Sequence, residues 1–178
     1  SEQTSAQAIA SGNELSVVFG TVHGDSDITA AAGKAEASGQ NAVSVADGNS
    51  TTIEIDEIVA SSSVPIIDIQ GGVSSAGNEM GDPLSLSAQA SASGNELSGV
   101  FGSVNSQSTD YVNLVAGNAL AYGQNAVAAA DSNRLTFDVS SLLSSQHFAV
   151  TGGMSVTGLA NAASLFLSAR ASASGNAV

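Results

Sequence analysis

The sequence predicts an all-β fold built from repeats: a β-solenoid, or cross-β-like stack, whose large rungs hold about 82 residues each. Blocks of sequence recur in the same order at a nearly constant offset, and apolar and polar residues alternate within each copy. Only 4% of the residues are aromatic, which favours closely stacked strands, because small side chains do not fill the gap between the two facing sheets of a sandwich.

The repeat is clearest in two blocks. Residues 11–16 read Ser-Gly-Asn-Glu-Leu-Ser and return as residues 93–98, while residues 39–43 return at nearly the same offset as residues 123–127. A third copy opens at residues 171–176. The chain therefore divides into repeat 1 (1–84), repeat 2 (85–164) and a partial third repeat (165–178), which we expect to act as a linking strand.

Alternation typical of β-strands runs through each copy. Ile53 and Ile55 alternate with Glu54 and Asp56, as in a strand with one buried face. Ser-Gly-Asn and Gly-Gln-Asn segments separate such runs and predict turns or corners. The Ala-rich residues 29–37 have helical propensity, but a glycine interrupts them and the alternation continues, so we expect a strand there.

Two arrangements of these strands fit the repeat. In the first, copy two lies directly on copy one at a strand spacing of about 4.8 Å, and matching amide side chains form ladders that satisfy one another's hydrogen bonds. In the second, each copy is a small antiparallel β-sandwich, and strand donation joins neighbouring subunits. The amide-bearing corners favour the solenoid, in which the expected ladders are Asn13 on Asn95 on Asn176, Gln40 on Gln124, and Asn41 on Asn125.

Aligned acidic residues lead to an expectation about pH. Direct stacking of the copies would place like charges about 5 Å apart, which would raise the pKa of each carboxyl group. Assembly should then strengthen as the pH falls, and calcium should be able to replace the protons. The aligned pairs are Glu14 with Glu96, Asp47 with Asp131, and Glu54 with Asp138.

The charge balance bounds the partners. The chain carries 16 acidic and three basic residues, a net charge of −13, so we expect neither nucleic acid nor an anionic membrane surface as a partner. It has no Cys, which excludes disulfides and thiol catalysis, and no apolar run long enough for a membrane-spanning helix. The first residue is Ser1 rather than Met, which fits a removed signal peptide as well as a trimmed chain.

The sequence predicts no enzyme. The two histidines occupy unmatched positions in the repeat, and no nucleophile elbow, P-loop or dinucleotide-binding motif is present. Asp25 and Asp27 follow a glycine and offer two carboxylates on one loop, so they form a candidate calcium site. We expect no other cofactor.

The corners and strands resemble those of a known class of proteins. Gly-Gln-Asn-Ala-Val and Ser-Gly-Asn corners on Ala-rich alternating strands look like the bacterial functional-amyloid fibre subunits of the curlin and Fap type. The resemblance covers residues 7–13 and 33–49 and their second copies. It implies a secreted subunit whose sheet edges pair with identical subunits.

The expected function is therefore structural. We expect a secreted subunit, extracellular or on the cell surface, that assembles head to tail with identical copies into a fibre of a biofilm matrix. Alternatives are a repeat segment of a cell-surface adhesin or surface-layer protein, and a passive solenoid that binds ice or glycan. The last strand has Arg170 as its one charge and no capping element, so its natural continuation is the N-terminal strands of the next copy.

Overall fold

The computed structural model describes residues 5–23, 27–60, 66–77, 87–106, 111–123, 125–142, 147–158 and 168–178. Within these ranges the chain forms β-strands and no helix, so the predicted all-β class is confirmed and no helix long enough to cross a membrane is present. The strands are β1 (Ser5–Ile9), β2 (Glu14–His23), β3 (Ile28–Ala37), β4 (Asn41–Val45), β5 (Ser50–Ala60), β6 (Ile66–Gly77), β7 (Ser87–Ser91), β8 (Glu96–Ser106), β9 (Tyr111–Tyr122), β10 (Asn125–Ala129), β11 (Arg134–Leu142), β12 (His147–Gly158) and β13 (Ser168–Ser172).

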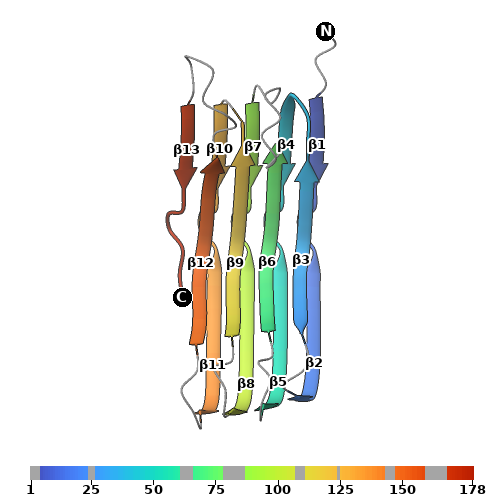
Figure 1. The fold of residues 1–178 in the computed structure, drawn as a ribbon, viewed down its shortest axis with the longest axis vertical. Helices are drawn as coiled ribbons and strands as arrows, with labels where there is room; N and C mark the ends of the chain where they lie inside the picture. Colours follow the sequence, from blue (N-terminus) through green and yellow to red (C-terminus); the bar gives the residue numbers. More distant parts are fainter. Residues whose placement is uncertain are drawn as a thin grey trace.

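The strands form three parallel sheets, which the chain visits in turn (Figure 1). Sheet A has the order β1-β4-β7-β10-β13, sheet B the order β2-β5-β8-β11, and sheet C the order β3-β6-β9-β12. We call three consecutive strands, one each in sheets A, B and C, a pass. Every strand pair among the described residues is parallel, which does not fit the alternative of two tandem antiparallel sandwiches.

One pass takes about half of the expected repeat length. Equivalent corner residues in successive passes are 36, 46, 38 and 43 residues apart. The prediction that a whole sequence copy forms one rung and lies directly on the next copy is therefore wrong. Repeats 1 and 2 each contribute two passes and the partial third repeat contributes β13, so the sheets continue from one sequence copy into the next.

The long strands of sheet C face both other sheets. Their first halves pack on sheet B, and their second halves pack on sheet A (Figure 1). The Ala-rich segment predicted as a strand is β3, which confirms that prediction. Sheets A and B meet at a corner in which the residue before the recurring Asn has a positive φ: Gly12, Gly48, Gly94, Ser132 and Gly175.

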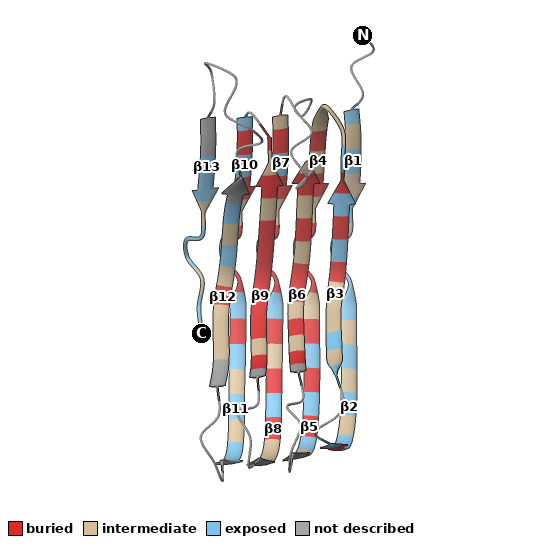
Figure 2. Cartoon of the chain, viewed as in Figure 1, coloured by how far each residue is buried: buried red, intermediate tan, exposed pale blue. Residues whose placement is uncertain are grey.

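The two halves of the interior are filled differently. Between sheets B and C lies a cluster of large apolar side chains that includes Ile53, Leu97 and Phe101. Between sheets A and C the cluster consists of alanines, and the small side chains let the two sheets approach closely. Figure 2 shows that buried residues concentrate in the middle passes, whereas β1 has none.

Candidate assembly site

A ladder of asparagines runs along the corner between sheets A and B. From the second Asn onward, the side-chain Oδ1 accepts hydrogen bonds from the backbone N–H and the side-chain amide of the Asn one pass earlier. At the centre, the Oδ1 of Asn95 lies 2.8 Å from the backbone nitrogen and 3.0 Å from the Nδ2 of Asn49. The same pair of bonds joins each neighbouring couple in the series Asn13, Asn49, Asn95, Asn133 and Asn176.

The ladder is satisfied inside the stack and open at both ends. Asn49, Asn95 and Asn133 are almost completely buried, so their amides depend on one another for hydrogen bonds. Among the described residues, the Oδ1 of Asn13 has no donor, and the N–H groups of Asn176 have no acceptor. The two ends of the ladder are thus complementary to each other.

A column of glycines on sheet C makes room for the ladder. Gly33, Gly72, Gly117 and Gly153 are register partners on adjacent strands. A Cβ atom on Gly72 would lie 2.5 Å from the carbonyl oxygen of Ala46 and 2.6 Å from the Oδ1 of Asn95. Any larger residue would therefore push sheet C away from the corner.

Serine and aspartate alternate in the column two residues before the Asn ladder. Asp47 accepts hydrogen bonds from the Ser91 hydroxyl at 2.8 Å and from the backbone N–H of Ser93 at 2.7 Å. One repeat later, Asp131 accepts equivalent bonds from Ser172 at 3.0 Å and Ser174 at 2.6 Å. The column reads Ser11, Asp47, Ser93, Asp131, Ser174.

These contacts act on the charge of Asp131. The backbone N–H of Ser174, the hydroxyls of Ser172 and Ser174, and the nearby cation of Arg170 together hold the pKa of the Asp131 carboxyl group below its ordinary value of 3.8, although desolvation opposes them. The carboxylate therefore favours the charged form while β13 is in place.

The alternation separates the acids that were expected to stack. Ser50 lies between Glu14 and Glu96, and Val100 lies between Glu54 and Asp138. Ser93 likewise separates Asp47 from Asp131. In none of the register pairs of the described strands do two carboxylates lie side by side. The expected like-charge pairs do not occur, so the predicted strengthening of assembly in acid loses its structural basis.

Of the predicted amide ladders, the one through Asn13, Asn95 and Asn176 is present with a different spacing, and the one that places Asn41 on Asn125 is wrong. Asn13, Asn95 and Asn176 share one ladder, but another Asn lies between each pair. Asn41 does not lie on Asn125, because Ser87 lies between them in the register and donates its hydroxyl to Asn41 at 3.0 Å. Gln40 accepts a bond from the Ser87 backbone through its carbonyl, and Gln124 lies outside the described residues.

Sequence reasoning missed Asn49 and Asn133. The sequence does contain a pattern that relates them to the ladder, because Asp47-Gly48-Asn49 and Asp131-Ser132-Asn133 share the final Asn with the Ser-Gly-Asn corners. The exchange of Ser for Asp in alternate passes concealed the relation. The glycine column was missed for the same reason, since its spacing follows single passes rather than the longer sequence repeat.

The candidate calcium site is only partly visible. Asp27 is exposed, and Asp25 lies outside the described residues. Within the described ranges no three His, Cys, Asp or Glu side chains gather into a group able to hold a metal ion. Calcium at this loop stays a prediction.

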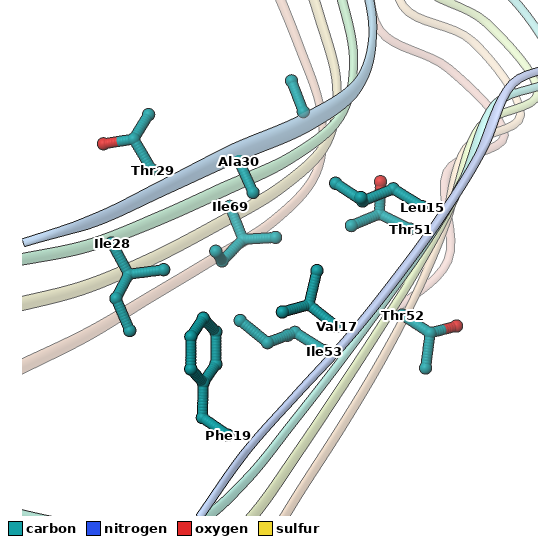
Figure 3. Close-up of a pocket in the computed structure, with 11 residues that line it drawn as sticks. Leu15, Val17, Phe19, Ile28, Thr29, Ala30, Thr51, Thr52, Ile53 and Ile69 are labelled. Carbon is teal, nitrogen blue, oxygen red and sulfur yellow. The ribbon is translucent and has the colours of Figure 1, made fainter. Parts of the chain in front are cut away.

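The interior is open at the N-terminal end of the stack. A cavity of about 390 Å³ lies between β2 and β3, lined by Leu15, Val17 and Phe19 on one side and Ile28 and Ala30 on the other (Figure 3). Phe19, Ile28 and Ala30 are only partly buried although they belong to the apolar cluster. The opposite end is similarly incomplete, because Phe137, Val139 and Val150 are partly buried there.

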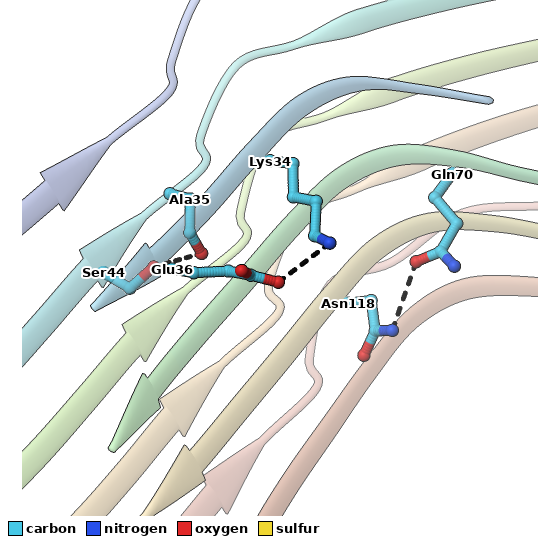
Figure 4. Close-up of polar contacts among 6 residues, drawn as sticks. All are labelled: Lys34, Ala35, Glu36, Ser44, Gln70 and Asn118. Atoms are coloured by element: carbon cyan, nitrogen blue, oxygen red, sulfur yellow. Dashed lines mark hydrogen bonds and ion pairs between the residues drawn. The ribbon is translucent and has the colours of Figure 1, made fainter. Parts of the chain in front are cut away.

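Polar side chains also lie on the outer face of sheet C. Asn118 donates its amide to Gln70 at 3.2 Å, and its own Oδ1 is buried with no partner (Figure 4). Lys34 and Glu36 form an ion pair of 2.8 Å, but both side chains are 62% exposed, so the pair contributes little to stability. These contacts lie within or between neighbouring strands and do not assemble a recognisable catalytic group.

Comparison with known proteins gives no relative: no protein-family model, no curated protein and no solved structure matches the chain.

Proposed function

We propose that the chain is a non-enzymatic structural subunit that assembles head to tail with identical copies into an extracellular fibre, and that its three sheets are the faces of a β-solenoid. The observation that carries this proposal is the Asn ladder. Its unused acceptor lies at the first pass and its unused donors lie at the last, so a second copy placed end to end would satisfy both.

The sheet edges support the same joint. In the part of the chain that the structure describes, β2 and β3 at one end and β11 and β12 at the other each pair with one strand, and Arg134 at the start of β11 also bridges to Ala177. Unpaired edges of parallel strands are templates for another strand of the same direction. The contact would use two different surfaces of the subunit, so it would not close on itself and would give a filament.

The apolar interior adds a driving force. Joining the two ends would cover the cavity beside Phe19 and Ile28 with the partly buried Phe137 and Val150 of another copy. Burial of apolar area is worth roughly 25 cal/mol per Å². The open interior at each end is therefore a favourable contact surface rather than a solvated cap.

The net charge of −13 does not oppose this joint locally. If β2 of a second copy continued sheet B in the existing register, Val18 would lie beside Asp138, just as Val100 does within the chain. The alternation of acidic and neutral residues would continue across the joint. The extracellular location and the matrix role rest on the resemblance of the corners to functional-amyloid subunits.

Negative-stain microscopy with analytical ultracentrifugation of the purified 178-residue chain tests the proposal. We expect unbranched filaments whose abundance rises steeply with protein concentration. A protein that remains a monomer at every concentration it tolerates in solution, without filaments after prolonged incubation, would show that its function is not assembly.

A further inference from the structure

The three sheets do not all end at the same pass of the stack. Among the described residues, sheet A has five strands, whereas sheets B and C have four, so β13 lies one pass beyond β11 and β12. When a second copy continues sheets B and C with its β2 and β3, its β1 falls on the place that β13 already holds beside β10. One of the two strands must leave that place.

β13 and β1 offer the same groups to a following β4. Within the chain, β1 and its corner bind the next pass through the backbone N–H of Ala10, the hydroxyl of Ser11 and the amide of Asn13. The segment after β13 carries Ala, Ser, Gly and Asn at the same spacing, at residues 173–176. β13 is therefore able to replace β1 on the β4 of another copy.

The two strands differ in what they offer to the preceding pass. The hydroxyl of Ser172 donates to Asp131, just as Ser91 in the interior strand β7 donates to Asp47. β1 has Ile9 at that position, and this side chain is 64% exposed. β13 thus has the residues of an interior strand, and β1 has those of an end strand.

We propose that β13 of one copy takes the place of β1 in the next copy, where it lies between its own β10 and the β4 of that neighbour. This inference rests on the proposed head-to-tail assembly and specifies its joint. β1 is the strand that leaves, because it lacks both the hydroxyl of Ser172 and the cation of Arg170 beside Asp131. The exchange is a form of strand addition in which main-chain hydrogen bonds provide the affinity.

The exchange completes the ladder. The backbone N–H and side-chain amide of Asn176 donate to Asn49 of the second copy, as Asn13 does within the chain at 3.0 Å for both bonds. The hydroxyl of Ser174 accepts the Asp47 N–H, which Ser11 accepts within one chain. The unused donors of Asn176 thereby find an acceptor, and Asn13, whose Oδ1 has no donor among the described residues, leaves the ladder together with β1.

Paired cysteines test the exchange, because the chain has none of its own. Gln7 is the register partner of Val43, and Arg170 holds the corresponding place in β13. Within one chain, three strand spacings separate position 170 from position 43, about 14 Å, which is too far for a disulfide. The double variant Arg170→Cys with Val43→Cys should therefore form covalent multimers, and only in assembled protein, on oxidation with copper phenanthroline.

The matched control is Gln7→Cys with Val43→Cys. In unassembled protein this pair should close within the chain, and in filaments formed under reducing conditions it should no longer do so, because β1 has left. Filaments that show no 170–43 multimers and retain the 7–43 bridge would overturn the exchange while leaving the fibre intact. Failure of the unmodified protein to assemble would overturn both the fibre and the exchange.

Discussion

At the residue scale, the stack depends on polar side chains that satisfy one another. Asn95 is fully buried and makes four side-chain-mediated hydrogen bonds to Asn49 and Asn133. A buried amide is stable only where its partners recur at the same place in each pass. This requirement is the physical reason why an Asn returns at every corner while the residues around it vary.

Replacement of Asn95 by alanine should therefore be costly. The N–H groups of Asn49 lose their acceptor and stay buried, so we expect the free energy of unfolding to fall by about 2–4 kcal/mol, measured by urea denaturation. Asn13→Ala is the matched control, because Asn13 is exposed at the end of the ladder, and it should cost under about 1 kcal/mol. Equal losses for the two variants would mean that burial of the ladder is unimportant.

The glycine column gives a second test at this scale. In Gly72→Ala the new Cβ meets the Ala46 carbonyl and the Asn95 side chain, so we expect a loss of about 1–3 kcal/mol in the free energy of unfolding. Gly20→Ala serves as the control, since a Cβ there meets nothing within 4 Å. Unfolding of both variants at the same denaturant concentration would contradict the close approach of sheet C to the corner.

The pH dependence follows from Asp131. Its pKa lies below 3.8 in the folded chain, so the stabilisation is fully present above about pH 4 and is lost as the pH falls through the lowered pKa. Acid should therefore weaken the contacts that Asp131 makes with β13 and its corner. Stacked carboxylates would instead have made assembly stronger in acid. Urea titrations between pH 5 and pH 2 should show a steeper loss for the wild type than for Asp131→Asn. Parallel curves for the two proteins would contradict this.

At the element scale, the sequence predicted the strands better than their stacking. Alternation identified β5, and the interrupted Ala-rich run identified β3. The predicted pass length was wrong because identical residues recur in every second pass, whereas the strand pattern of the backbone recurs in every pass. An acidic residue next to another acidic residue is unfavourable, so alternate passes carry Asp and Ser at one place, and a search for identical blocks finds only the longer period.

The open edge of β2 is the place to interrupt assembly without unfolding the subunit. Ser50 donates its N–H to the carbonyl of Asn13, so the odd-numbered residues at the start of β2 face β5 and Val18 turns its N–H toward the free edge. Val18→Pro removes that donor, and its exposed side chain leaves the core unchanged. We expect filaments to be lost while the far-UV circular dichroism stays that of a β-protein.

Val18→Thr is the control for this edge, because it keeps the N–H and the β-branched shape. It should assemble like the wild type in a sedimentation assay. Filaments of normal abundance from Val18→Pro would show that β2 is not part of the joint.

At the scale of the whole molecule, subunits are proposed to continue one another along the stacking direction. Sheets B and C have four strands each in the described part of the chain, and the strand exchange leaves four strands per subunit in sheet A as well. At a strand spacing of about 4.8 Å, each subunit should lengthen the filament by about 19 Å.

Helical reconstruction of the filaments by electron cryomicroscopy measures this axial rise per subunit directly. We predict a rise of about 19 Å, with the strands perpendicular to the filament axis. A rise of about 10 Å, which two large rungs per subunit would give, or strands parallel to the axis would contradict the proposed stacking.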